Sequence, residues 1–155
     1  MNVLFLDIDG VLNNTAMWKN PDAVWRSNQT DIIMDLDNMQ CLKELVFLTG
    51  CKIVLSTSWR TLGNRIRYVF QEADLPPIED ATPVLGMNAR AEEIQQYLLE
   101  HPDVDRYVIL DDCDVFPGDI HNHLVQTNPM TGLTMEDVRK ACAIITTPLS
   151  NSPSL

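Results

Sequence analysis

Three short apolar runs constrain the fold of this 155-residue chain more than any other feature of its sequence. They are VLFLD at residues 3–7, CKIVLS at 51–56 and RYVILDD at 106–112. Because apolar residues follow one another without alternation, each run is typical of a strand that is buried on both faces, as in a parallel sheet. Segments with helical spacing of apolar residues lie between the runs. The pattern predicts an α/β fold, a mainly parallel three-layer sandwich with helices on both faces of the sheet.

The segments around these runs predict the remaining elements. In chain order they are an insertion at 13–37 with irregular structure or short helices, helices at 38–50, 62–73 and 91–100, a short strand in the proline-marked loop at 76–83, an edge strand at 123–127, a helix capped by Thr134 and Asp137, and a frayed tail at 146–155. Asn38 is the expected N-cap of the first helix and Gly50 its end. We expect one domain over residues 1–155, with a small flap at 13–37 and no large cap.

Charge and composition exclude some functions. Eleven basic and 22 acidic residues give a formal net charge of −11, which disfavours tight binding to extended nucleic acid because such binding depends on clustered lysines and arginines. The sequence contains no apolar stretch long enough to span a membrane and no basic segment before its first apolar run, so we expect neither a membrane anchor nor a signal peptide. The four cysteines form no CxxC pair, which favours reduced thiols and a cytoplasmic location.

Polar side chains gather where the three apolar runs end. They are Asp7 and Asp9 after the first run, Ser56 and Thr57 at the end of the second, and Asp111 and Asp112 at the end of the third. The carboxyl ends of parallel strands meet at one edge of a sheet, where such folds bind their ligands. The alternative is that these residues only end strands and cap the next helices. Clustered carboxylates without histidine favour Mg²⁺ over zinc, so we expect a magnesium site there.

The motifs themselves resemble those of a known superfamily. LFLDIDGVLN is similar to motif I of the haloacid dehalogenase (HAD) superfamily of phosphohydrolases, IVLSTSWR to motif II, and VILDDCD to motif IV. The combination of DIDGVLN, STSWR, AEEI and RYVILDD resembles the small HAD domains of multidomain RNA-repair proteins. The resemblance covers residues 3 to about 142 and implies a HAD-like, Rossmannoid fold.

The resemblance also implies roles for the motif I residues. Asp7 would be the nucleophile that attacks phosphorus and forms an aspartyl-phosphate. Asp9 would be the general acid toward the leaving oxygen and then the general base for the hydrolytic water. Alternation along the strand end directs both side chains to one side, and Gly10 would allow the tight turn that follows. Ser56 and the backbone N–H of Thr57 would bind the phosphate.

The metal ligands and the phosphate cation follow from the same resemblance. Asp7, Asp111, Asp112 and the Asp9 carbonyl are the expected Mg²⁺ ligands, with Asp111 or Asp112 in direct contact. Arg90, just before the AEEI helix, is the expected motif III cation, and the competing candidates are Arg60 and Arg65.

Other conspicuous residues have plainer interpretations. Trp18 and Trp25 either cover the site from the insertion or pack on the core. Trp59 is expected to be structural or to orient Arg60, and the Glu92–Glu93 pair to be a solvated helix start.

The polar cluster at the strand ends and the resemblance to the HAD superfamily together imply a Mg²⁺-dependent phosphatase that hydrolyses a phosphomonoester through an aspartyl-phosphate. A nucleotide or another small phosphate ester is the favoured substrate. The alternatives are an RNA or DNA end phosphatase that acts with a partner, a low-turnover module that binds phosphate, and a phosphotransferase that uses an alcohol as acceptor. The sequence does not set the oligomeric state.

Overall fold

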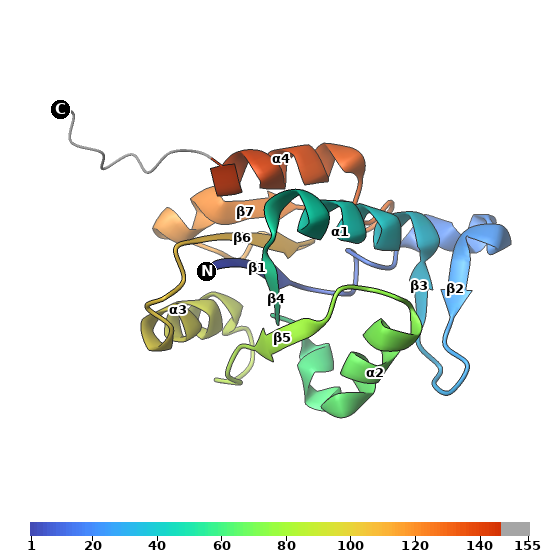
Figure 1. The fold of residues 1–155 in the computed structure, drawn as a ribbon, viewed down its shortest axis with the longest axis horizontal. Coiled ribbons are helices and arrows are strands. Elements are labelled where there is room, and N and C mark those ends of the chain that lie inside the picture. The colour runs from blue at the N-terminus through green and yellow to red at the C-terminus, as the bar shows by residue number, and fades with distance from the viewer. Residues whose placement is uncertain (147–155) are drawn as a thin grey trace.

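The central element of the protein is a five-stranded parallel sheet. A computed structural model describes residues 1–146; the predicted tail at 146–155 lies almost wholly outside them. The strands are β1 (Asn2–Leu6), β4 (Lys52–Leu55), β5 (Ile78–Ala81), β6 (Arg106–Asp111) and β7 (Leu124–Gln126). Their order is β5-β4-β1-β6-β7, with every pairing parallel. The predicted α/β fold is therefore confirmed, and both short predicted strands lie at the edges of the sheet (Figure 1).

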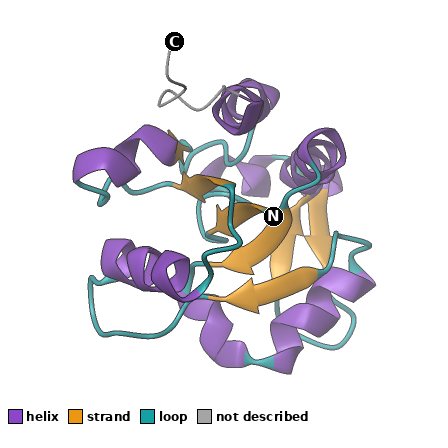
Figure 2. Cartoon of the chain, turned by 60° about the vertical axis from the view of Figure 1, so that its left-hand side comes forward, coloured by secondary structure: helices purple, strands orange, loops and turns teal. Residues whose placement is uncertain are grey.

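Helices cover both faces of the sheet. They are α1 (Leu36–Thr49), α2 (Asn64–Glu72), α3 (Arg90–Glu100) and α4 (Met135–Thr146). One face of β1 packs Leu4 and Leu6 into a core shared with α1, α2 and α4, and the other packs Val3 and Phe5 against α3. The two faces of one strand thus serve two cores, which is why its residues are apolar without alternation. Figure 2 shows the resulting three layers.

The N-terminus of α1 differs from the prediction. Asp35, not Asn38, is the N-cap: its carboxylate accepts from the backbone N–H groups of Asp37 and Asn38. Asn38 is buried inside the helix and donates its amide to the carbonyls of Thr131 and Leu133. Asp is as good a cap as Asn, so a local pattern could not separate the two. Gly50 ends the helix with φ 67°, as expected.

The insertion between β1 and α1 is a small lobe. It contains the 3₁₀ turns Thr15–Lys19 and Pro21–Ala23, followed by an antiparallel pair of β2 (Val24–Arg26) and β3 (Ile33–Asp35). At its base the Asn14 amide donates to Asp35 Oδ2 over 3.1 Å. The Arg26 guanidinium lies 5.9 Å from the ring centroid of Trp18, and Trp25 packs against the core.

The last helix begins as predicted. The Thr134 backbone N–H and hydroxyl both donate to Asp137 Oδ2 over 3.0 Å, and the Asp137 N–H donates back to Thr134 Oγ1 over 3.3 Å. This reciprocal cap satisfies N–H groups that the helix itself leaves free.

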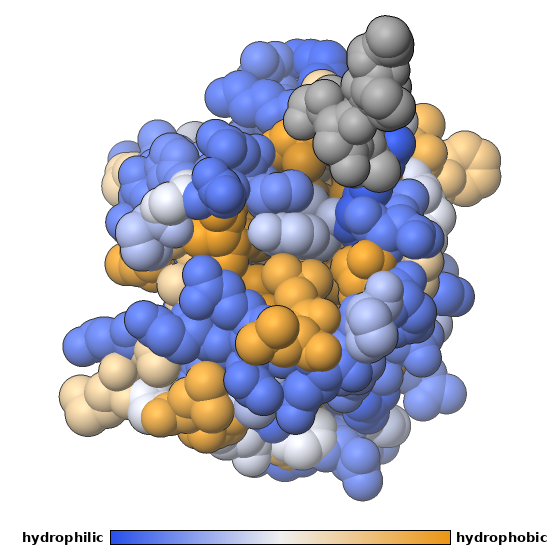
Figure 3. Space-filling model, turned by 90° about the vertical axis from the view of Figure 1, so that its left-hand side faces the viewer, coloured by the Kyte–Doolittle hydropathy of each residue, from blue (hydrophilic) through white to orange (hydrophobic). Residues whose placement is uncertain are grey.

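The surface is mainly hydrophilic on the face that carries α3, with apolar side chains scattered between the polar ones (Figure 3). None of the helices within residues 1–146 combines the length and the hydropathy that crossing a membrane requires.

Candidate active site

The site lies at the carboxyl ends of three adjacent strands. In register, Leu6 pairs with Leu55 on one side and Leu110 on the other. The next residues continue the pairing, because the Asp7 N–H donates to the Leu110 carbonyl over 3.0 Å and the Ser56 N–H to the Leu6 carbonyl over 2.9 Å. The ladder therefore fixes the backbones of the three motifs side by side, as the sequence predicted.

Arg90 joins two buried carboxylates. Its Nη1 lies 2.7 Å from Asp111 Oδ2 and 3.3 Å from Asp7 Oδ2. Asp7 is 4% exposed and Asp111 is fully buried. Arg90 is the first residue of α3, so this helix aims the guanidinium at the end of the sheet. Of the three candidate cations, Arg90 is the one that contacts Asp7; Arg65 is exposed on α2.

The charges in this cluster alter one another's protonation. Burial raises the pKa of the Asp7 carboxyl to about 7, with a further contribution from the charge of Asp111, while Arg90 and hydrogen bonds from Thr57 and the Ile8 N–H oppose the rise. Burial also raises the pKa of Asp111 against the effect of Arg90. A single guanidinium therefore does not fully compensate two buried acids, and further positive charge would stabilise their ionised forms.

Asp9 has very different surroundings, although it is only two residues from Asp7. It is exposed. The Trp59 indole Nε1–H donates to one carboxylate oxygen over 3.0 Å, and the Asn13 amide donates to the other, also over 3.0 Å. The Gly10 N–H in turn donates to Asn13 Oδ1 over 2.9 Å. Two neutral donors thus fix the orientation of this carboxylate.

Ser56 and Thr57 provide hydrogen-bonding groups beside Asp7. Both are 1% exposed. Ser56 Oγ is buried and has no hydrogen-bond partner among residues 1–146, and such an orphan hydroxyl is costly unless a ligand completes it. Thr57 is the N-cap of the 3₁₀ turn Ser58–Leu62 and hydrogen-bonds Asp7 through its side chain. This pair marks a place where an acceptor-rich ligand would bind.

Asp112 packs directly on the turn after β1. A Cβ on Gly10 would overlap the Asp112 carboxylate, and Gly10 has φ 78°, so only glycine fits there. Asp111, Asp112 and Cys113 each offer a side-chain atom that could bind a metal ion, and these three atoms lie within 4.8 Å of one another. Carboxylate oxygens suit Mg²⁺ and a thiol does not. The two acids, the buried Asp7 and the charge imbalance described above therefore fit a hard divalent cation.

Arg60, the second candidate for the phosphate cation, is paired with Glu93 instead of with Asp7. Its Nη2 lies 2.7 Å from Glu93 Oε2, with side chains 9% and 3% exposed, and its Nη1 donates to the Thr57 carbonyl over 2.8 Å. Glu93 also accepts from the Leu85 N–H over 3.0 Å. The prediction that Glu93 is a solvated residue is therefore wrong; it is a buried partner that links α3 to motif II.

Sequence reasoning missed three contributors to the site: Asn13, Trp59 and Glu93. Trp59 and Glu93 act through partners distant in the chain. Asn13 lies inside motif I, four residues from Asp9, but asparagine has many structural uses. Trp59 is conspicuous within the STSWR motif, but the sequence separation between this motif and Asp9 does not predict that the two residues make contact.

The fold and its carboxylate cluster are those of a small HAD-type domain. The sequence profile of a family described as "HAD domain in Swiss Army Knife RNA repair proteins" matches residues 3–138, and the chain belongs to this family. Membership indicates a phosphohydrolase-type function on a phosphorylated substrate. Comparison with curated proteins gave no match, and neither did comparison with solved structures.

Proposed function

We propose that the protein is a Mg²⁺-dependent phosphatase that hydrolyses a phosphomonoester through an aspartyl-phosphate on Asp7. The observation that carries the proposal is the contact of Arg90 with Asp7 and Asp111 at the end of the central strand. A carboxylate held beside a guanidinium, with an orphan hydroxyl next to it, forms a place where a phosphate can bind and be attacked.

Binding would use donors that the free protein leaves available. Ser56 Oγ–H and the Thr57 backbone N–H would donate to phosphate oxygens. Arg90 has five N–H groups, and its Nη1 is the atom that meets both carboxylates. The remaining N–H groups would neutralise the phosphate as it approaches Asp7.

The chemistry would occur in two displacements. An Asp7 oxygen forms a bond to phosphorus while the bond to the leaving oxygen breaks, and Asp9 gives that oxygen its proton. Water then attacks phosphorus, Asp9 takes the proton from this water, and the bond from Asp7 to phosphorus breaks. Asp9 suits both proton transfers because it is exposed and held in one orientation by Trp59 and Asn13.

Asp7, Asp111, Asp112 and the Asp9 carbonyl would hold the Mg²⁺. When bound, the ion would supply positive charge to the phosphate and to the buried acids.

The favoured substrate is a nucleotide or another small phosphate ester. The formal charge of −11 weighs against long nucleic acid. Cleavage of RNA or DNA end phosphates, with a partner that supplies basic surface, is the second candidate, and the RNA-repair description of the family favours it.

The four cysteines are all free thiols, which supports a reducing, cytoplasmic setting.

The test is phosphate release from p-nitrophenyl phosphate, a panel of nucleotides and 3′-phosphorylated oligonucleotides, with Mg²⁺ and with EDTA. Release that needs Mg²⁺ and disappears in Asp7→Asn supports the proposal. Asp22→Asn makes the same chemical change at an exposed residue of the insertion and serves as the matched control. A folded protein that releases phosphate from no substrate contradicts phosphatase function and favours a module that only binds phosphate.

A further inference from the structure

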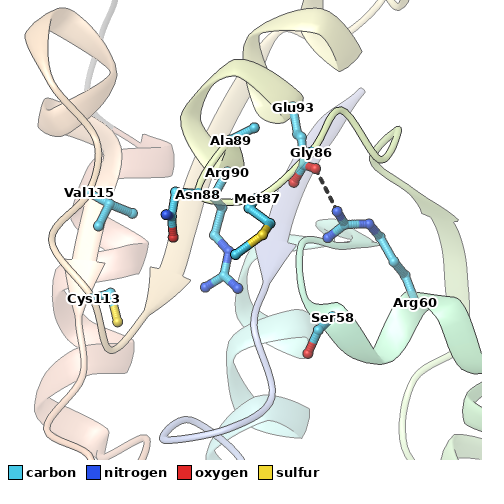
Figure 4. Close-up of a pocket in the computed structure, with 10 residues that line it drawn as sticks. All are labelled: Ser58, Arg60, Gly86, Met87, Asn88, Ala89, Arg90, Glu93, Cys113 and Val115. Carbon is cyan, nitrogen blue, oxygen red and sulfur yellow. Dashed lines mark hydrogen bonds and ion pairs between the residues drawn. The ribbon is translucent and has the colours of Figure 1, made fainter.

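A cavity opens at Arg90, and its other lining residues have no role in the proposed reaction. Its volume is about 340 Å³, and three segments line it: the start of the 3₁₀ turn after motif II, residues 86–89 with the first turn of α3, and residues 113–115. In the view of Figure 4, Val115 and Cys113 lie on one side, Ser58 and Arg60 on the other, and Met87 between them. A volume of this size falls within the range of small-molecule pockets.

The polar part of the cavity wall includes two guanidinium groups, Arg60 and Arg90, which can only donate hydrogen bonds. The Nη1 of Arg60 donates to the Thr57 carbonyl and its Nη2 to the Glu93 carboxylate. Its Nε–H is buried and has no hydrogen-bond partner within residues 1–146. Ser58 and Asn88 add a hydroxyl and an amide, each of which can donate or accept. Glu93, the acid in this wall, already accepts from Arg60 and from the Leu85 N–H. A ligand of this pocket therefore needs acceptor atoms.

The remaining wall is apolar and uncovered. Met87 is 92% exposed and Val115 is 52% exposed. Both line the cavity, so a ligand with a flat apolar face would cover surface that is now in water. The pocket thus combines donors for one edge of a ligand with apolar contacts for its face.

The pocket is continuous with the phosphate site through Arg90, which lines the cavity and contacts Asp7. We propose that it binds the organic part of the substrate, and that this part carries a planar, acceptor-bearing heterocycle of the nucleobase type. The proposal rests on the proposed function for its orientation, with the phosphate on Arg90 and the heterocycle between Met87 and Val115.

The test compares binding of adenosine 5′-monophosphate and ribose 5-phosphate, which differ by the base, to Asp7→Asn protein in Mg²⁺ by titration calorimetry. We expect the base to tighten binding about tenfold, the effect of removing roughly 55 Å² of apolar surface from water. Met87→Ala or Val115→Ala, each added to Asp7→Asn, removes most of this preference. Val84→Ala is the matched control, because Val84 is 63% exposed in the same loop but does not line the cavity.

Equal affinity for the two ligands overturns the proposal, and so does a loss of preference in Val84→Ala as large as in Met87→Ala. The experiment distinguishes failure of the pocket proposal from failure of the proposed phosphatase function. A base preference that depends on Met87 and Val115 supports the pocket even if the wild-type protein hydrolyses no ester. Hydrolysis of both esters with no preference in binding supports the phosphatase and removes the pocket.

Discussion

Asp7 and Asp9 belong to one short motif and occupy opposite electrostatic environments. Asp7 is buried, lies beside a second acid and shares a guanidinium with it. Asp9 is exposed, and within the part of the chain that the structure describes its carboxylate accepts hydrogen bonds from the neutral donors Trp59 and Asn13. The difference indicates two tasks: charge that must be compensated at one carboxylate, and orientation that must be kept at the other.

The largest effect is expected at Asp7. Asp7→Asn replaces the attacking carboxylate with a neutral amide, so turnover should fall by about 10⁴-fold or more, the scale seen when a nucleophile is removed. Phosphate release measures the loss for every substrate alike, and Asp22→Asn should keep wild-type rates. Residual turnover within tenfold of wild type would show that Asp7 is not the nucleophile.

Asp9 should show a dependence on the leaving group that Asp7 lacks. Asp9→Asn should reduce turnover of an alkyl phosphate by roughly 10²–10⁴-fold, because this leaving group needs a proton. The leaving group of p-nitrophenyl phosphate is a stable phenolate anion that needs no proton, so turnover of this ester should fall much less in the first displacement. An equal loss for both esters, measured in single-turnover reactions, would argue against Asp9 as the acid.

Arg90 tests the charge compensation on the Asp7 side. Arg90→Ala should lower kcat/KM by about 10²–10³-fold through the lost stabilisation of the phosphate. Arg90→Lys keeps the charge but not the fork of donors, so it should recover part of the loss. If the wild-type protein hydrolyses the ester and Arg90→Ala barely changes kcat/KM, the assignment of Arg90 as the phosphate cation is wrong.

Trp59 tests the orientation on the Asp9 side with a smaller effect. Trp59→Phe removes one hydrogen bond of roughly 0.5–1.5 kcal/mol, so turnover of an alkyl phosphate should fall by up to about tenfold, with little change for p-nitrophenyl phosphate. In an Asp9→Asn background the substitution should have no further effect. Trp18→Phe, at a tryptophan that is 55% exposed in the insertion, is the control. A uniform loss for both esters would instead indicate general damage to the fold.

The final prediction concerns stability. Burial raises the pKa of Asp7 from 3.8 to about 7 in the folded protein, so between these values the folded state binds more protons than the unfolded state. Stability contributed by this group is therefore lost as pH rises from about 4 to 7. Thermal unfolding in EDTA across this range should show a Tm that declines with pH more steeply in wild type than in Asp7→Asn. Asp22→Asn should keep the wild-type slope, and identical slopes in Asp7→Asn and wild type would refute the burial argument.

The sequence predicted the parts of the molecule that depend on local pattern. Continuous apolar runs predicted the central strands, and the polar residues at their ends lie together because parallel strands end at one edge. Pairings between distant side chains could not be predicted in the same way. The bond from Trp59 to Asp9 and the ion pair of Arg60 with Glu93 span 50 and 33 residues. They depend on how the turn after β4 packs against β1 and α3, which no local pattern encodes.

The closed base of the insertion has a consequence for protein engineering. The chain leaves the core at Asn14 and returns at Asp35, and these two residues are tied by a side-chain hydrogen bond, with a backbone bond from the Asp35 N–H to the Leu12 carbonyl over 2.9 Å. The lobe is also anchored elsewhere, because Ile32 and Met34 are buried in the core and the Ser27 hydroxyl and the Asn28 N–H donate to the Glu72 carboxylate. New recognition loops should therefore be tolerated at the exposed residues 18–22, where a change of length costs little closure entropy, and not across the whole segment between Asn14 and Asp35.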